Sequence, residues 1–346
     1  MTSLDPLDVA VPLMRAESTS GGEGEVIAVM ERLLGARGWP VRRIPVGSGR
    51  DCLFATATAE PLVTLSTHLD TVPPYIPPRV DGSRLYGRGA CDAKGIAAAM
   101  VCAAERLRAE GAPVALLFVI GEETVHDGAH AANAWARANL TTSRALINGE
   151  PTESTLALGT KGALRLFVRT AGRAAHSAYP HLGHSATRDL VQLLAGLDSL
   201  DLPRDELLGE TTVNIGTLSG GVADNVVAPS AEARLMVRLV TPVEEIVELL
   251  RRWVNGRAEL EVYSTVPAVR LGAVPGFRTS VVAYATDIPE LTGWGTPYLF
   301  GPGSIHVAHT AGEYIEIEEM RSAVGAFIEI AKKALSGSNA GGVVGP

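Results

Sequence analysis

Two short polar segments of this sequence combine side chains that bind metals with side chains that move protons. The segment 66–70 (STHLD) places His68 two residues before Asp70, and the segment 121–124 (GEET) contains Glu122 beside Glu123. Each segment follows an apolar run that predicts a buried strand. Imidazole and carboxylate groups are the usual ligands of a catalytic zinc ion, and a further carboxylate can serve as the base. The two segments therefore predict a metal site with its own base.

A hydrolytic site with two metal ions needs one ligand that bridges both ions, which lie about 3.5–4 Å apart. It also needs a terminal His and carboxylate on each ion, and a base that takes a proton from water. The candidates in this sequence are His68, Asp92, Glu122, Glu123, Glu150 and His309. Asp92 lies in the segment 87–95 (GRGACDAKG), directly before a predicted helix. The glycines allow a sharp turn there, and the helix N-terminus favours a carboxylate.

The elements that must position these residues follow from the apolar pattern. Buried strands are predicted over 62–66, 114–120 and 145–148, and helices over 23–36, 95–111 and 129–138. Continuous apolar strands separated by helices predict an α/β domain whose sheet is mainly parallel and covered on both faces. Ligands bind beyond the carboxyl ends of such strands, and His68, Glu122 and Glu150 all follow such ends.

The middle of the chain has a different pattern, in which apolar and polar residues alternate along the strands. The predicted elements are strands over 164–168, 213–218, 231–240 and 259–263, with helices over 186–200 and from a capping box at 241–244 to 254. The order β-α-β-β-α-β is that of a ferredoxin-like α+β unit. We therefore predict that residues 162–266 are inserted into a catalytic domain made of residues 1–161 and 267–346. A helix over 318–335 precedes a tail, from about residue 336, whose Gly and Ser predict flexibility.

Composition excludes several classes of protein. The net charge of −8 and the absence of a basic stripe argue against a nucleic-acid partner. No apolar run approaches the ~18 residues of a membrane span, and the N-terminus lacks the pattern of a signal peptide. The cysteines Cys52, Cys91 and Cys102 are odd in number and fit neither a disulfide framework nor a zinc knuckle. These features predict a cytoplasmic protein in a reducing setting with no membrane partner.

The polar segments, taken in order, resemble the M20 family of metallopeptidases and N-acyl-amino-acid deacylases. The matching segments are 68–70 (HLD), 89–95 (GACDAKG), 122–123 (EE), 149–152 (GEPT) and 308–310 (AHT). They span nearly the whole chain in the family's order, which makes the set specific although HxD or EE alone is weak. The segment 301–305 (GPGSI) is most similar to the acetylornithine deacetylases, and the lysine-pathway deacylases are similar there.

The resemblance implies two Zn²⁺ ions per chain, with Co²⁺ able to substitute. It implies that Asp92 bridges the two ions. His68 and Glu150 would complete one ion, and Glu123 and His309 would complete the other. The site would thus draw its ligands from positions 68 to 309, and nearly the whole chain would contribute to one centre.

The resemblance also implies roles for residues that do not bind metal. Glu122 would be the general base, and Asp70 would orient His68, since metal-bound imidazoles generally need such a partner. The segment 174–178 (AAHSA) resembles a lid motif whose histidine, His176 here, reaches the active site, in many members from the other subunit. The inserted domain would accordingly form a homodimer.

Three further positions match substrate-binding residues of the family. They are Asn225 in the segment 220–227 (GGVADNVV), Arg238 on a predicted strand, and the backbone around Gly303. Taken alone, Arg238 could decorate an exposed strand face and His176 could lie at the surface of a turn. His184 departs from the family pattern. We interpret His126, His130, His181, His184 and His306 as surface or structural residues.

The expected activity is removal of an N-acyl, most simply acetyl, group from an amino acid such as acetylornithine or acetyl-lysine, a reaction of arginine or lysine biosynthesis. The alternatives within the family are a dipeptidase or carboxypeptidase and a succinyl-diaminopimelate desuccinylase. The metal motifs do not separate them, because each reaction cleaves an amide. A metal-free, non-catalytic homologue is a further alternative, against which the complete ligand set and the base argue.

Overall fold

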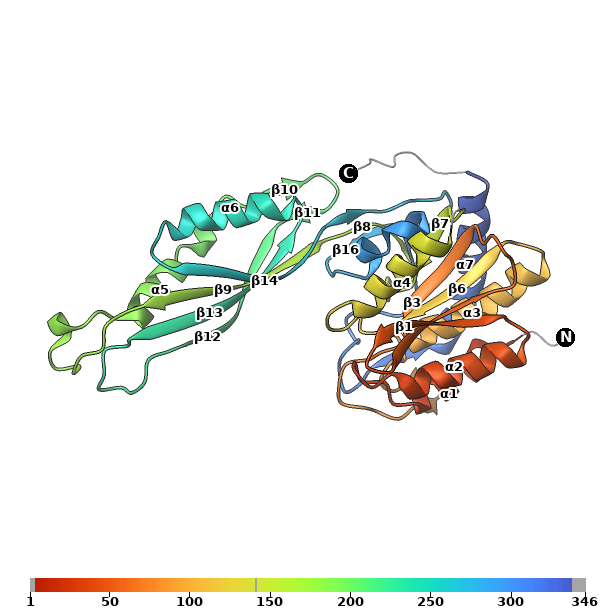
Figure 1. The fold of residues 1–346 in the computed structure, drawn as a ribbon, viewed down its shortest axis with the longest axis horizontal. Helices are drawn as coiled ribbons and strands as arrows, with labels where there is room; N and C mark the ends of the chain where they lie inside the picture. Colours follow the sequence, from red (N-terminus) through yellow and green to blue (C-terminus); the bar gives the residue numbers. More distant parts are fainter. Residues whose placement is uncertain (1–3, 141, 338–346) are drawn as a thin grey trace. The chain divides into compact units, whose positions relative to one another are not determined.

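The computed structural model describes residues 4–140 and 142–337, and it divides into two compact units (Figure 1). The first unit comprises the described residues up to Leu158, Arg270–Ser280, and those from Thr286 onward. The second unit comprises Gly159–Val269 and the short segment Val281–Ala285, which the sequence pattern had not separated from the first domain. Of the tail predicted to be flexible, residues 338–346 lie outside the described part of the chain.

The first unit is built on a sheet with the order β1-β2-β6-β3-β7-β17-β8-β15, in which β16 pairs with β8. Its strands are β1 (Val41–Gly47), β2 (Arg50–Thr56), β3 (Val63–His68), β6 (Val114–Val119), β7 (Ala145–Asn148), β8 (Leu156–Thr160), β15 (Val269–Arg270), β16 (Thr279–Val282) and β17 (Thr296–Leu299). The strands β8, β15 and β16 span the boundary between the two units, and each has residues in both. The neighbours β6, β3, β7 and β17 are parallel, whereas β1 and β2 pair antiparallel at one side. The predicted α/β class with a mainly parallel central sheet is confirmed.

Helices pack on this sheet and exclude water from its centre. They are α1 (Pro6–Arg15), α2 (Gly24–Ala36), α3 (Lys94–Ala109), α4 (Asp127–Asn139) and α7 (Ile317–Leu335), with 3₁₀ turns η3 (Ile288–Glu290) and η4 (Thr292–Trp294). The alanine-rich α3 contacts β3 and β6 as well as α1 and α7, because its small side chains allow close approach on several sides. No helix in the described ranges has the length and apolar character to cross a membrane.

A small separate sheet joins two distant parts of the first unit. It has the order β18-β5-β4, with β4 (Arg79–Asp81), β5 (Arg84–Tyr86) and β18 (Tyr314–Glu316). The strand β5 leads into the segment that carries Asp92, and β18 follows the loop that carries His309. This pairing brings the two loops together, although about 220 residues separate them in the sequence.

The second unit has an antiparallel sheet with the order β12-β13-β9-β14. Its elements are β9 (Gly162–Ala171), η1 (Pro180–Leu182), α5 (Ala186–Leu194), η2 (Leu197–Ser199), β10 (Arg204–Asp205), β11 (Gly209–Glu210), β12 (Thr212–Gly220), β13 (Ser230–Leu239), α6 (Val243–Val254) and β14 (Glu259–Val266). Leu166, Val168, Leu235 and Ile246 pack in its core. The four main strands and two helices follow the β-α-β-β-α-β order of the sequence pattern.

Two local predictions in this unit were wrong. The helix expected over 186–200 ends at Leu194, and only the short turn η2 continues it beyond Gly196. The capping box at 241–244 does not form, because α6 begins one residue later than expected. Pro242, with ψ of 142°, is extended and stands at the N-cap itself, so that Thr241 is one position too far from the helix. The Thr241 hydroxyl is buried and lacks a hydrogen-bond partner in the described part of the chain.

Candidate metal centre

The order of the central strands brings the predicted site residues to one edge of the sheet. The strand β3 lies between β6 and β7 and runs parallel to both. His68 is the last residue of β3, Glu122 follows β6, and Glu150 follows β7. Because the carboxyl ends of parallel strands meet at the same edge, His68 is flanked by the acidic residues of the two neighbouring strands.

Asp92 lies between two histidines that come from distant parts of the chain. Its Oδ1 lies 3.0 Å from Nε2 of His68, and its Oδ2 lies 3.2 Å from Nε2 of His309. Glu123 Oε1 is 2.8 Å from the same nitrogen of His309, and Glu150 Oε2 is 4.0 Å from Nε2 of His68. Each oxygen of one carboxylate therefore faces a different imidazole, which is the arrangement that a bridging ligand requires.

Asp70 supports both the first histidine and the acidic turn after β6. Its Oδ1 lies 3.5 Å from Nδ1 of His68, whose ring nitrogen is also 3.0 Å from the Asp70 carbonyl oxygen. The two carboxylate oxygens accept hydrogen bonds from the backbone N–H groups of Glu122 and Glu123, at 3.2 Å each, and Oδ2 accepts one from Ser20. The buried Asp70 is thus placed to hold the imidazole and the Glu122–Glu123 turn in one orientation.

A buried ion pair that the sequence analysis missed connects the Asp92 loop to the His309 loop. Glu313 Oε1 accepts from the backbone N–H groups of Cys91 and Asp92, and its Oε2 lies 2.6 Å from Nη1 of Arg88. Arg88 in turn donates to the backbone carbonyls of His309 and Thr310. Arg88 lies within the motif that contains Asp92, and Glu313 lies four residues after His309. The sequence around each residue gives no sign that the two side chains form an ion pair.

The charges of the cluster shift the pKa values of its members in opposite directions. Burial opposes ionisation of both Asp92 and His68, yet the hydrogen bonds between imidazole and carboxylate lower the pKa of Asp92 and raise that of His68. Hydrogen bonds to Asp92 and Glu123 raise the pKa of His309 to about 10. Burial, followed by the charge of Glu150, raises the pKa of Glu122.

The donor set of this cluster fits divalent zinc. Ligand-type atoms of His68, Asp92 and Glu123 all lie within 4.8 Å of one another. Imidazole nitrogen and carboxylate oxygen are both zinc ligands, and the surplus of carboxylates over histidines gives the site the negative charge that favours a cation. Within residues 4–140 and 142–337, no hydrogen bond or ion pair joins the Glu122 side chain to His68 or His309, which is consistent with a residue that does not bind the metal of this centre directly.

The residues predicted to bind substrate from the inserted domain lie together in the second unit. His176 forms a backbone bridge with Val226, and the N–H of Ser177 donates to the carbonyl of Asn225 at 2.9 Å. The side chains of His176 and Asn225 are exposed. Arg238 is partly buried on β13, and burial lowers its pKa. Their roles towards the metal centre remain predictions.

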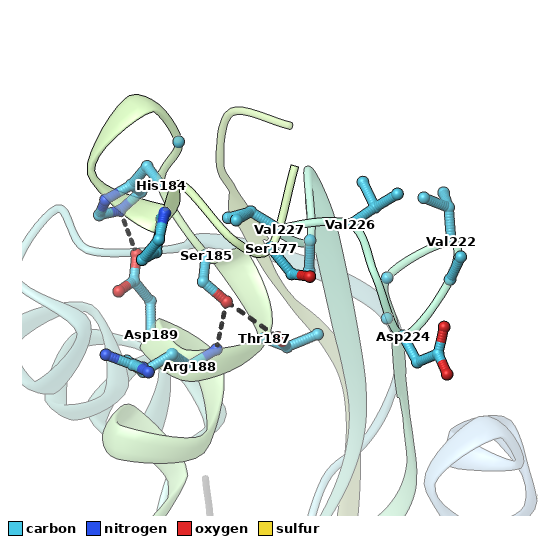
Figure 2. Close-up of a pocket in the computed structure, with 16 residues that line it drawn as sticks. Ser177, His184, Ser185, Thr187, Arg188, Asp189, Val222, Asp224, Val226 and Val227 are labelled. Carbon is cyan, nitrogen blue, oxygen red and sulfur yellow. Dashed lines mark hydrogen bonds and ion pairs between the residues drawn. The ribbon is translucent and has the colours of Figure 1, made fainter. Parts of the chain in front are cut away.

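A cavity of about 860 Å³ lies beside the His176 segment in the second unit (Figure 2). Ser177 and Val226 line it, together with Asp224 and the start of α5. His184, the departure from the family pattern, lines the same cavity, where its Nε2 lies 2.5 Å from Oδ2 of Asp189. None of the predicted metal ligands is among the lining residues.

Gly303 has a structural reason to be glycine. Its φ is 85°, and a Cβ there would lie 2.7 Å from Cβ of Cys91. Its N–H donates to Oε1 of Glu319 at 3.1 Å, and its carbonyl accepts from the N–H of Glu153. The backbone polar groups of Gly303 are therefore already paired within the protein. The predicted contact of this backbone with a substrate carboxylate remains a prediction.

Comparison with known proteins gives consistent matches. The sequence model described as "Peptidase family M20/M25/M40" matches residues 64–333. A peptidase M20 domain-containing protein of Schizosaccharomyces pombe is 37% identical over 320 residues, which cover 89% of this chain and 79% of that protein. A Paracoccidioides brasiliensis protein named "Probable carboxypeptidase" is 37% identical over 367 residues, covering 92% of this chain and 83% of the relative.

Solved structures match the fold over almost the full length. A tripeptidase of Staphylococcus aureus superposes with a TM-score of 0.80 at 20% identity, covering 96% of this chain and 98% of the other. A dinuclear metal-binding peptidase of Bacillus subtilis superposes with a TM-score of 0.72 at 17% identity and the same coverage of both chains.

Proposed function

Since this chain belongs to the M20/M25/M40 peptidase family, we propose that it is a di-zinc hydrolase that cleaves the amide bond of a small peptide, as a carboxypeptidase or dipeptidase. The observation that carries this proposal is the position of Asp92, whose two oxygens face His68 and His309 separately. The dinuclear Bacillus subtilis peptidase with the same fold supports the number of ions.

The names of the relatives revise the substrate expected from sequence. The segment 301–305 suggested an acetylornithine or acetyl-lysine deacetylase, but the similar Paracoccidioides brasiliensis protein is named a carboxypeptidase and the similar Staphylococcus aureus structure is a tripeptidase. A peptide substrate is therefore the first candidate. N-acyl-amino-acid deacylation is the second, because the same segment follows β17 at the edge of the sheet that carries the metal ligands.

The proposed chemistry assigns separate tasks to the side chains. His68, Glu150, Glu123 and His309 would hold the two ions, with Asp92 shared between them. Bound zinc supplies Lewis acidity that polarises the scissile carbonyl and acidifies water. Glu122 takes a proton from the attacking water and delivers it to the leaving amine.

The second unit would supply the contacts to substrate. In this proposal Arg238 pairs with the substrate carboxylate, Asn225 hydrogen-bonds the substrate, and His176 donates to the oxyanion that develops at the carbonyl. The pairing of the His176 and Asn225 segments would let the two side chains act as one substrate-binding surface.

A hydrolysis panel tests the reaction and separates the two candidates. The zinc-loaded protein is assayed with several dipeptides and tripeptides, and with N-acetyl-ornithine, N-acetyl-lysine and N-succinyl-diaminopimelate. We expect cleavage of peptides with a free C-terminal carboxylate to exceed that of the N-acyl amino acids. Higher kcat/KM for an N-acyl amino acid would select the deacylase. No hydrolysis of any compound, by protein with a full zinc complement, would refute both candidates.

Replacing His176 with alanine is expected to lower kcat by ~10²–10³, as is typical for loss of an oxyanion donor. Zinc content and secondary structure should be unchanged, because the residue binds no metal in this scheme. Elemental analysis and circular dichroism check those two points. His181→Ala is the matched control, since His181 is another exposed histidine of the same segment. A His176→Ala enzyme that works at the full rate would remove this role.

We also propose that the chain forms a homodimer through the edge strand β12. Almost every residue of this nine-residue strand is exposed, including Ile215 at 43% and Leu218 at 52%. A long exposed strand edge invites pairing with a second chain. Light scattering should show a dimer that Leu218→Lys weakens, whereas Tyr263→Lys on the opposite edge strand β14 should leave it intact. An active wild-type monomer would contradict the dimer.

Mixing inactive variants tests whether His176 acts across such a dimer. A heterodimer of His176→Ala and Glu122→Ala chains keeps one site with an intact base and, if the contact crosses the interface, the partner's intact histidine. Recovered activity would support the cross-subunit contact. If subunit exchange is confirmed independently and activity is not recovered, His176 acts in the active site of its own chain.

A further inference from the structure

A second group of metal-binding side chains lies on the other side of the proposed base. Ligand-type atoms of Glu122, His126 and Asp287 all lie within 4.8 Å of one another, and none of the three is a proposed ligand of the main centre. His126 Nδ1 lies 2.7 Å from Oδ1 of Asp287. His126, interpreted from sequence as a surface or structural residue, is largely buried: only 18% of its side chain is exposed, and it belongs to this cluster.

The cluster is held by two elements that are distant in sequence. Glu122 and His126 lie in the turn between β6 and α4, where His126 has a φ of 55° and directly precedes the helix. Asp287 lies at the start of η3 and accepts the N–H of Glu290 on its carbonyl oxygen. A second contact joins α4 to η3 outside the cluster: His130 Nδ1 lies 3.1 Å from Glu290 Oε2.

The environment of Asp287 leaves one of its carboxylate oxygens available to a ligand. The residue is 1% exposed, and its Oδ2 atom is buried with no hydrogen-bond partner in residues 4–140 and 142–337. A buried carboxylate oxygen without a partner is costly, and a cation would satisfy it. Its other oxygen contacts His126, so the carboxylate is directed towards the cluster.

The main centre provides an internal comparison. There, the contacts between imidazole nitrogen and the carboxylate oxygens of Asp92 and Glu123 are 2.8–3.2 Å. The contact between His126 and Asp287 also joins an imidazole nitrogen, here Nδ1, to a carboxylate oxygen at a similar length, and Glu122 adds a second carboxylate. One imidazole and two carboxylates form a set of three protein ligands of the kind that holds zinc.

We propose that Glu122, His126 and Asp287 form a third Zn²⁺ site, weaker than the main centre, whose occupation inhibits the enzyme. The inhibition rests on the proposed function, because it assumes that Glu122 is the general base. A carboxylate that coordinates a cation is a weaker base, because the positive charge of the cation opposes uptake of a proton from water. Excess zinc would thus switch off hydrolysis without displacing either ion of the main centre.

Zinc binding by the full-length protein tests the site without any assay of activity. Equilibrium dialysis against rising Zn²⁺, followed by elemental analysis, should show tight binding at the main centre and then one further, weaker ion. Loss of a residue that merely supports a zinc ligand costs about 10–100-fold in affinity, so His126→Gln and Asp287→Asn should each weaken the further ion by at least that factor. His130→Gln, whose histidine pairs with Glu290 outside the cluster, should leave it unchanged.

Inhibition provides the second readout. Zn²⁺ above the main-centre stoichiometry should inhibit wild type and His130→Gln, whereas Asp287→Asn and His126→Gln should need at least tenfold more Zn²⁺ for the same fractional loss. Mg²⁺ at equal concentration should not inhibit, because it binds imidazole poorly.

The two readouts separate failure of the site from failure of the proposed function. A protein without hydrolase activity that still binds the further ion through His126 and Asp287 would refute the function and keep the site. A wild type that binds no further ion, or a further ion retained at full affinity in both cluster variants, would overturn the third site. Inhibition equal in wild type and both variants would overturn its link to Glu122.

Discussion

Replacement of Glu122 with glutamine is expected to lower kcat severely while the main centre keeps close to two zinc ions per chain. The loss should be about 10²–10⁴-fold in kcat, the usual contribution of a general base. The Glu122 backbone N–H, not its side chain, bonds to Asp70, so the turn that carries Glu123 should keep its position. Steady-state kinetics and elemental analysis at low free zinc measure the two quantities.

Glu290→Gln is the matched control for this variant. Glu290 is the last residue of η3, close in sequence to Asp287. Its side chain pairs with His130 and belongs to neither of the two proposed metal sites. It should retain its zinc and its rate. A Glu122→Gln protein that turns over at the wild-type rate, or one that loses its tightly bound zinc, would show that Glu122 has another role.

Replacement of Asp92 with alanine is expected to release both zinc ions together and to abolish activity. The reason is that its two oxygens face His68 at 3.0 Å and His309 at 3.2 Å, so that one substitution removes a ligand from each ion. Zinc titration followed by calorimetry should show neither tight binding event. Circular dichroism checks that the fold survives, which we expect because Glu313 accepts from the backbone N–H of Asp92 and does not depend on the Asp92 side chain.

Glu123→Ala is the comparison that makes the Asp92 result specific. Glu123 contacts only the imidazole of His309 within the proposed set, so its loss should weaken one ion by a larger factor than the other. Two tightly bound ions in Asp92→Ala would eliminate the bridging role, as would a stepwise loss that matches that of Glu123→Ala.

The sequence alone determined which residues could do the chemistry and which element each would follow. Apolar runs such as 114–120 are continuous because β6 is buried along its whole length, and this continuity is visible without a structure. The polar residues directly after these runs then stand out, as His68 and Glu122 do. The alternating pattern of the middle segment likewise predicted β9 and β13, because one face of each strand is buried, where α5 packs, and the other is more exposed.

Boundaries and caps were less predictable. Thr241 has the sequence of a capping residue, but the extended backbone of Pro242 moves the helix start by one position. The helix α1, for which the sequence analysis made no prediction, begins after the N-cap Asp5, which accepts from the N–H of Leu7, and continues through Pro12. Local sequence cannot decide where such helices begin and end. The free energy of tertiary packing at a helix end is as large as the effect of a single capping residue or proline there.

Only the tertiary structure decided which side chains meet. His68 lies between acidic turns because β3 is placed between β6 and β7, and no local pattern encodes that strand order. Arg88 and Glu313 pair across 225 residues, and His126 and Asp287 across 161. Their partners are far along the chain, so the residue types appear ordinary in sequence. The fold buries these side chains, and an unpaired charge costs much more free energy when it is buried than when it is exposed. These residues therefore become parts of a site only in the folded protein.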